Sequence, residues 1–349
     1  SPSIEKKIEI LHLISDLGIQ SADIGLPGAG KQVQEQVLRL AREIVDQKLN
    51  IFPNCAARTL KVDIQPIVDI SQKAGIPIEA STFIGSSPIR QYAENWSIDV
   101  LLKNTEEAVT FVVKSGLPNM YVTEDTTRAR PDDVRKLYTT AIECGAKRIC
   151  LCDTVGHATP DGVRNLVRFA KQVVADTGEE VKIDFHGHRD RGLDIPNTLA
   201  AVEAGVDRVH GCALGIGERC GNTPMDLLLV NLKLMGVIDN DLTKLREYCL
   251  TVSEATGVPI PVGYPVVGPD AFRTGTGVHA AAVIKAIKKE DNWLIDRVYS
   301  GVPAGMFGLE QKIEVGPMSG LSNVHYWLSS RGYPVKEDVA EAIFDAAKE

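Results

Sequence analysis

The first two thirds of the chain alternate short apolar segments with longer amphipathic ones, and this rhythm constrains the fold more than any other feature. The longer segments carry apolar residues three and four positions apart, and several end in glycine, as helices do. Strands that alternate with helices form a parallel sheet. We predict seven such strands, centred near Asp23, Ile51, Ile78, Tyr121, Leu151, Asp184 and Val209.

Polar and charged residues follow nearly every predicted strand. A closed barrel gathers functional side chains at the carboxyl ends of all its strands, whereas an open doubly wound sheet binds ligands at one switch point. We therefore predict a (β/α)8 TIM barrel. The chain opens on a helical segment, residues 3–18, with Ser1 or Ser3 as a candidate cap, so we expect the first barrel strand to precede Ser1 and to be missing here.

The pattern changes after Gly236. A helical segment at residues 240–257 is followed by a connector rich in proline and glycine, and then by a short region that is mostly helical. We predict a TIM-barrel domain over residues 1–237, and a linker with a small helical C-terminal subdomain over residues 238–349.

Composition excludes several classes of function. The net charge of −8 disfavours a nucleic-acid or anionic-membrane surface. No apolar run approaches the roughly 18 residues that a membrane span needs, and no signal peptide is visible at the N-terminus. The seven cysteines contain no CxxC pair, which is typical of reduced thiols in the cytoplasm. We expect a cytoplasmic protein that binds neither nucleic acid nor membrane.

The segment IDFHGHRDRGLD places His186 and His188 one residue apart at the end of a predicted strand. Residues i and i+2 of a strand point to the same side, so both imidazoles would face one divalent metal ion: zinc, manganese or magnesium. A pair of satisfied surface histidines is an equally good interpretation of these two residues alone.

A glycine-rich loop, GCALGIGERCGNTPMD, follows the next strand and leads into a helix. Such a loop lets backbone amides approach an anion. Asn222 lies at the loop–helix junction, where it would reach a metal held by the histidines or simply cap the helix. Gly215, Gly217 and Gly221 are spaced one residue too widely for a dinucleotide fingerprint.

A second loop, GLPGAGKQ, nearly matches a phosphate-binding loop. Gln32 stands where that motif needs a hydroxyl for magnesium, and Pro27 removes an amide donor, so an NTPase is a distant alternative. Elsewhere, Glu124 follows a strand and is a candidate general base. Asp153 and Thr154 are candidate caps of local backbone as well as site residues.

The segments HGHRDRGL and GIGERCGNTP together resemble the paired signatures of the metal-dependent Claisen-condensing barrels. That group comprises the 2-isopropylmalate, homocitrate and citramalate synthases, with 3-hydroxy-3-methylglutaryl-CoA lyase as a cousin. The segments ADIGLP, TFIGSSPI, VTEDTTRA and CDTVGHATP fall where the group has similar motifs, and PVVGPDAFRTGTGVHAAAV resembles its subdomain segment. The Gly-Glu-Arg form of the loop favours the synthases over the lyase.

The resemblance implies a transfer of the acetyl group of acetyl-CoA to a 2-keto acid by metal-dependent Claisen condensation, followed by thioester hydrolysis. The best single guess is 2-isopropylmalate synthase acting on 2-ketoisovalerate in leucine biosynthesis. It also implies a homodimer in which the C-terminal subdomain reaches the partner's barrel. The implied residues are the metal ligands His186, His188 and Asn222, the catalytic Glu124, His279 and Tyr299, the substrate-binding Thr154, Ser81, Arg90 and Arg189, and the CoA-binding Gly217, Glu218 and Arg219.

The chain also departs from the group. Relatives often have histidine where this chain has Ser81 and Arg90, and asparagine where it has Arg189, so the identity of the keto acid stays open. The first strand of the group, which carries an Arg-Asp pair, is not found in the chain. Homocitrate and citramalate synthases remain close alternatives, and a lyase remains an enzymatic rival because Cys212 lies near the position of the lyase's reactive cysteine. A non-catalytic barrel that binds metal or CoA is the distant alternative.

Overall fold

The computed structural model describes residues 2–349, and the chain divides into two compact units, Ser1–Leu229 and Val230–Glu349. The division falls within helix α9 (Met225–Leu234). The domain boundary after residue 237 stays a prediction. Each unit is described by itself below.

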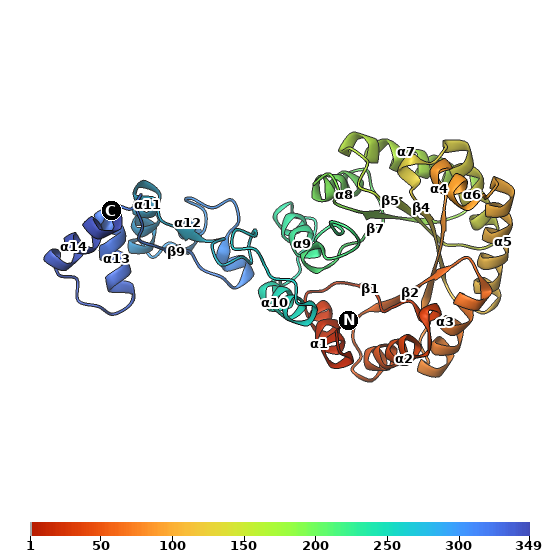
Figure 1. Ribbon diagram of the computed structural model, residues 1–349, viewed down its shortest axis with the longest axis horizontal. Helices are drawn as coiled ribbons and strands as arrows, with labels where there is room; N and C mark the ends of the chain where they lie inside the picture. Colours follow the sequence, from red (N-terminus) through yellow and green to blue (C-terminus); the bar gives the residue numbers. More distant parts are fainter. Residues whose placement is uncertain (1) are drawn as a thin grey trace. The chain divides into compact units, whose positions relative to one another are not determined.

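The first unit is built on one curled sheet of seven parallel strands, with its helices around the outside (Figure 1). The spatial order of the strands is the order in the chain, β1 to β7, so each helix connects two neighbouring strands in the manner of a βα barrel. Seven parallel strands of this kind confirm the predicted α/β barrel class. The strands are β1 (Ser21–Asp23), β2 (Phe52–Arg58), β3 (Glu79–Gly85), β4 (Asn119–Glu124), β5 (Arg148–Asp153), β6 (Lys182–Gly187) and β7 (Arg208–Val209).

Side-chain caps explain where several helices of this unit begin. Ser3 accepts a hydrogen bond from the N–H of Lys6 and starts α1, and Ser97 and Thr159 do the same for α5 and α7. Ser1, the other predicted cap, lies outside the described residues. The helices are α1 (Ile4–Asp16), α2 (Lys31–Asp46), α3 (Lys61–Ala74), α4 (Pro88–Glu94), α5 (Ile98–Lys114), α6 (Pro131–Glu143), α7 (Pro160–Thr177) and α8 (Asp194–Glu203), with 3-10 turns at Pro27–Ala29, Thr126–Arg128 and Ala213–Gly215.

Two strands lie later in the chain than predicted. β2 and β3 begin at Phe52 and Glu79, directly after their predicted centres at Ile51 and Ile78. Each strand continues through small residues, such as Cys55 and Ala80, that are fully buried. A strand that packs small side chains lacks the bulky β-branched residues by which strands are recognised in a sequence.

The interior of the curled sheet contains charged side chains at its amino-terminal end. Glu79 on β3, Arg148 on β5 and Arg208 on β7 come from alternate strands, as the members of one layer inside a barrel do. Asp184 on β6 completes the set. Glu79 and Asp184 are buried, and the four side chains carry two negative and two positive charges. We call these four residues the ion layer.

The contacts within the ion layer are short. Arg208 donates to Asp184 at 2.6 Å and to Glu79 at 2.7 Å, and Arg148 lies 2.5 Å from Asp184 and 3.5 Å from Glu79. Arg208 also donates to the hydroxyl of Ser21 on β1, at 3.1 Å. A single guanidinium on β7 therefore links four strands across the interior, including β1 at the other edge of the sheet.

The second unit has several helices and one small sheet. Strands β8 (Arg273–Thr274) and β9 (Lys312–Ile313) pair in parallel. Ala280, Val283 and Ile284 of α11 form a core with Ile313. No helix of residues 2–349 is both long enough and apolar enough to cross a membrane. The helices are α10 (Leu245–Thr256), α11 (Gly277–Lys288), α12 (Asn292–Ile295), α13 (Leu321–Ser330) and α14 (Glu337–Lys348), with a 3-10 turn at Ala304–Phe307.

We expect the substitution Arg208→Ala to lower the free energy of unfolding by about 3–5 kcal/mol, because it leaves buried carboxylates without their partner. The matched control is Arg39→Ala, which breaks the exposed ion pair with Glu5 and should leave the free energy of unfolding nearly unchanged. Urea unfolding followed by circular dichroism measures both. Equal effects of the two substitutions would contradict the role given to the ion layer.

Candidate functional site

Two histidines lie side by side at the carboxyl end of β6. His186 is within the strand, and His188 directly follows it, where its backbone N–H donates to the carbonyl of Asp153. The ring centroids are 5.3 Å apart, so the period of two places both imidazoles on one face as the sequence predicts. Burial is the main cause that lowers the pKa of His186, to about 3, with the nearby His210 and His188 as further causes.

Asn222 joins the two imidazoles. Its side-chain amide lies 3.2 Å from Nε2 of His186 and 3.2 Å from Nε2 of His188, and a short backbone bridge pairs residue 222 with residue 188. Gly217 allows this placement, because a Cβ atom at residue 217 would collide with the carboxamide oxygen of Asn222. An amide exchanges its oxygen and nitrogen by a half-turn, so Asn222 can present either atom to the space between the histidines.

A supporting row, His210 and Asp184, connects His186 to the ion layer. His210, which follows β7, lies with its Nδ1 atom 3.3 Å from Nδ1 of His186, and its Nε2 atom lies 2.9 Å from Oδ2 of Asp184. Burial raises the pKa of Asp184, but the hydrogen bond from His210 and the charges of Arg208 and Arg148 outweigh it and hold that pKa below its usual value. Asp184 is therefore an anion at neutral pH.

Sequence reasoning missed this supporting row. Asp184 entered the sequence analysis only as the centre of a strand, although it lies two residues before His186 and so shares its face. A charged residue on the inward face of a buried strand is the signal that would have found it. His210 had no such signal, because its contact with His186 depends on how neighbouring strands align.

Arg219 of the glycine-rich loop lies over the other histidine. Its guanidinium donates to Asp190 at 2.7 Å and to the carbonyl oxygen of Thr154 at 2.7 Å, and it lies 3.3 Å from Nδ1 of His188. A guanidinium can only donate, so this last contact favours a lone pair on Nδ1. Binding of a cation by Nε2 of His188 would require Arg219 to release Nδ1. Gly217 and Glu218, also predicted for the site, are exposed in the same loop.

Glu124 is the last residue of β4, and Thr154 directly follows β5, so both lie at the carboxyl end of the sheet. The hydroxyl oxygen of Thr154 accepts the backbone N–H of Asp125 at 2.8 Å, which leaves the hydroxyl hydrogen to donate elsewhere. The half-buried carboxylate of Glu124 has no hydrogen-bond partner in the part of the chain that the structure describes. Burial raises its pKa, the positive charge of Arg90 opposes this, and Asp125 adds to it.

Asp153 has a structural role. It is fully buried and accepts hydrogen bonds from the backbone N–H groups of His157 and Ala158, at 2.8 and 3.2 Å. The alternative interpretation of Asp153 as a cap of local backbone is therefore confirmed, and this carboxylate anchors the loop that carries Thr154.

The other predicted substrate residues have different surroundings. Ser81 on β3 is buried, and among the described residues its hydroxyl has no hydrogen-bond partner. Arg90 pairs with Glu94 at 3.0 Å on the surface of α4. Arg189 lies 3.7 Å from Asp194, below the glycine-rich loop. The hydroxyl of Ser81 therefore has free hydrogen-bonding capacity for a ligand, and each guanidinium also keeps N–H groups beyond its ion pair.

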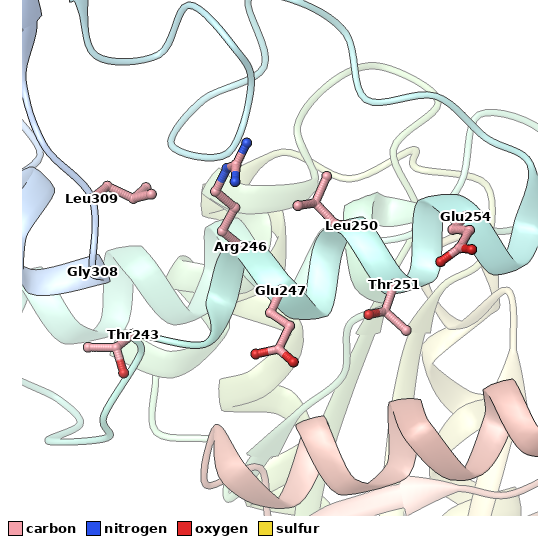
Figure 2. Close-up of a pocket in the computed structure, with 8 residues that line it drawn as sticks. All are labelled: Thr243, Arg246, Glu247, Leu250, Thr251, Glu254, Gly308 and Leu309. Carbon is pink, nitrogen blue, oxygen red and sulfur yellow. The ribbon is translucent and has the colours of Figure 1, made fainter. Parts of the chain in front are cut away.

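The remaining predicted catalytic residues lie in the second unit. His279 and Tyr299 stack with ring centroids 4.2 Å apart, and both are exposed. A hollow of about 360 Å3 also lies in this unit, on the surface of α10 (Figure 2). None of the predicted site residues lines it. Its lining residues are Thr243, Arg246, Glu247, Leu250, Thr251, Glu254, Gly308 and Leu309.

The histidine pair fits a divalent cation only as part of a mixed set of donors. Within residues 2–349, no group of three His, Cys, Asp or Glu side chains converges in a way that would hold a metal. Two imidazole nitrogens and one amide oxygen are nevertheless suitable ligands, and an open position beside them suits a catalytic site. His186 and Asn222 fit such a set, and His188 would join them if Arg219 released its Nδ1 atom.

The chain matches the family model described as HMGL-like over residues 1–252. The chain belongs to the HMGL-like family. It is 32% identical to the homocitrate synthase AksA of Methanopyrus kandleri over 99% of this chain and 82% of that protein. It is also 32% identical to a probable 2-isopropylmalate synthase of Ignicoccus hospitalis, with the same coverage. The resemblance seen in the sequence is thus confirmed.

Solved structures of HMGL-like proteins share the fold. The 3-hydroxy-3-methylglutaryl-CoA lyase of Bacillus subtilis superposes with a TM-score of 0.61 at 20% identity, over 74% of this chain and 89% of that one. This likeness supports the barrel architecture of the first unit. The two relatives that share 32% identity with this chain are synthases, so this chain is an enzyme of the condensing-synthase kind.

We expect the imidazole of His186 to stay neutral from pH 8 to pH 5, because its lowered pKa means that the fold favours the uncharged form. The unfolded chain takes up this proton near pH 6.5, so the same burial makes the fold less stable as the pH falls below that value. NMR of histidine-labelled protein measures it, with His186→Gln to assign the signal. A titration midpoint near 6.5 would contradict the burial.

Proposed function

We propose that this protein condenses acetyl-CoA with a small 2-keto acid and then hydrolyses the thioester, the reaction of a 2-isopropylmalate synthase. The observation that carries the proposal is the convergence of two imidazoles and one amide beside an arginine-bearing glycine-rich loop. We place the enzyme in the cytoplasm, where its cysteines, all free in the described residues, stay reduced.

A divalent metal held by His186, His188 and Asn222 would, when bound, polarise the ketone as a Lewis acid. Thr154 would bind the carboxylate of the keto acid, because its hydroxyl hydrogen is free to donate. Ser81 would donate to the same substrate from the interior, since its buried hydroxyl has no other partner in residues 2–349.

Glu124 would act as the general base. Its carboxylate has no hydrogen-bond partner within the described chain, and its raised pKa makes it a stronger base than an exposed glutamate. It would remove a proton from the acetyl methyl group, and the resulting carbanion would add to the keto carbon. The exposed amides of Gly217 and Glu218 would bind an anionic part of the CoA, as loops of this kind do.

His279 and Tyr299 would act on the barrel of a partner subunit in a homodimer. The support for this is that the two rings are stacked yet exposed, so both keep a face for contact with another molecule. Water activation for the hydrolytic half of the reaction is a suitable task for such an imidazole.

The keto acid is the finer part of the proposal. We favour 2-ketoisovalerate, which would place the enzyme in leucine biosynthesis. The equal identity to a homocitrate synthase makes 2-ketoglutarate the second substrate to test, and pyruvate the third.

The decisive experiment is release of CoA thiol from acetyl-CoA with each of these three keto acids, first with a divalent metal and then with a chelator. We expect chelator-sensitive release with one keto acid. No release with any of them would overturn the proposed function.

The substitution Glu124→Gln should lower kcat by about 100-fold to 10,000-fold, which is the usual contribution of a general base. The matched control is Glu106→Gln, on the exposed face of α5, which should leave kcat unchanged. In the parent enzyme, activity should fall on the acid side with a midpoint above 4.5, because burial raises the pKa of Glu124. A midpoint at or below 4.5, or an active Gln variant, would argue against this base.

The lyase is a second candidate because the structure exposes the thiol that it would use. Cys212 follows β7 and is exposed, and burial against the sheet raises the pKa of its thiol. We expect Cys212→Ser to keep at least half of the condensing activity. Loss of turnover with metal content intact would favour the lyase.

A further inference from the structure

A short turn after β4 is bound to the end of β5 by hydrogen bonds of its own. The regular pairing of β4 with β5 ends at Thr123 and Leu151. Beyond it, three successive residues of the turn each contact one residue at the end of β5 or directly after it. These contacts are the Asp125 N–H to Oγ1 of Thr154 at 2.8 Å, the Cys152 N–H to Oγ1 of Thr126 at 2.9 Å, and the Thr127 hydroxyl to Oδ1 of Asp153 at 3.1 Å. The turn therefore extends the pairing of the two strands as far as the rim.

The backbone of Asp125 decides whether the turn can make these contacts. Its φ and ψ angles are 59° and 39°, the left-handed conformation. These two angles set the direction in which the chain leaves Asp125, so they place Thr126 and Thr127 against β5. Residues other than glycine rarely adopt a positive φ, and Asn and Asp tolerate it best. An alanine here would favour a backbone that carries the turn away from β5.

Arg128 holds the turn closed. Its Nε atom donates to Oδ1 of Asp125 at 2.8 Å and its Nη2 atom donates to Oδ2 at 2.8 Å, which is the two-point geometry of a strong arginine–carboxylate pair. Only 8% of the Asp125 side chain is exposed, so salt and water screen this pair less than a surface pair. We call Asp125 and Arg128 the turn clamp.

We propose that the two residues of the turn clamp are positioning residues that hold the hydroxyl of Thr154 in place, with its hydrogen free for an acceptor on the ligand. Oγ1 of Thr154 accepts the N–H of Asp125, so the hydroxyl hydrogen points elsewhere. The carbonyl oxygen of Thr154 accepts from Arg219 at 2.7 Å, so the glycine-rich loop holds the main chain of this residue as well. This inference rests on the proposed function for the identity of the ligand, a carboxylate, but not for its first test.

An effect of the turn clamp through position can be distinguished from an effect through charge. Asp125 and Arg128 carry opposite charges, so the pair adds no net charge to the rim. Removal of Asp125 leaves a guanidinium that attracts an anionic ligand, and removal of Arg128 leaves a carboxylate that repels it. An effect through charge therefore has opposite signs in the two variants, whereas an effect through the position of Thr154 weakens binding in both.

The first test is hydrogen exchange of the backbone amide of residue 125, measured by NMR on the chain without any ligand. We expect Thr154→Val, which removes the acceptor, to lower the protection factor of this amide about 10-fold. Asp125→Ala and Arg128→Met should lower it by a similar factor, because each opens the turn. Asp125→Asn keeps the left-handed preference and an acceptor oxygen for Arg128, so its protection factor should stay within about twofold of the parent value.

The second test is the KM for the keto acid. We expect Asp125→Ala and Arg128→Met each to raise KM about 10-fold with a much smaller change in kcat, because Thr154 would bind the carboxylate equally in the ground and transition states. Asp125→Asn should keep KM near the parent value. Neither Asp125→Ala nor Arg128→Met should raise KM further when it is added to Thr154→Val, since both act through that hydroxyl.

The matched control is Arg164→Met. Arg164 also pairs with an aspartate three residues away, Asp161 at 2.9 Å, but on the exposed surface of α7. This variant should change neither the exchange of the Asp125 amide nor KM. A far-UV spectrum and a melting temperature comparable with those of Arg164→Met identify folded clamp variants. If Asp125→Ala and Arg128→Met unfold, the exchange measured in Thr154→Val and Asp125→Asn still decides.

Three results would overturn the turn clamp. They are an amide of residue 125 that is as protected in Thr154→Val as in the parent, an Asp125→Ala or Arg128→Met variant that exchanges like Arg164→Met, and KM changes of opposite sign in Asp125→Ala and Arg128→Met. The proposed reaction fails separately. A chain with the expected exchange that releases no CoA would overturn the synthase and keep the turn clamp, and a chain that turns over with the same exchange in every variant would do the reverse.

Discussion

The hydrogen bonds to Asp184 connect the stability of the barrel with the chemistry of its site. One oxygen of this buried carboxylate accepts from Arg148, and the other accepts from both Arg208 and His210. The arginine contacts join β5, β6 and β7 and extend through Arg208 to β1 and β3. His210, which contacts Asp184, also contacts His186 nearer the carboxyl end of the sheet. The same anion thus holds neighbouring strands together and orients the residue that would bind the cation.

The interior of the first unit is layered because side chains alternate along each strand. Asp184 lies on β6 in the ion layer, His186 lies two residues nearer the carboxyl end of the strand, and His188 directly follows the strand at the rim. Residues with structural, supporting and chemical tasks therefore come from one strand at a spacing of two. Glu124 at the end of β4 completes the rim together with Thr154 and Arg219, which lie in the loops after β5 and β7.

Much of the fold could be predicted because the βα rhythm is a local property. The seven parallel strands, their order and the grouping of His186, His188 and Asn222 all agree with the sequence. The supporting row could not be predicted in full, since the contact of His210 with His186 depends on the alignment of β6 with β7. The centres of β2 and β3 were predicted too early in the chain, because the small residues of these strands resemble loop sequence.

The close contact between Gly217 and Asn222 has a consequence for substitutions in this loop. The carboxamide oxygen of Asn222 occupies the volume that any side chain at residue 217 would fill. Any side chain introduced at residue 217 would therefore have to displace this carboxamide. Such a displacement would move the amide out of its place between the two imidazoles. A change at residue 217 in the loop thus acts on the histidine pair through Asn222.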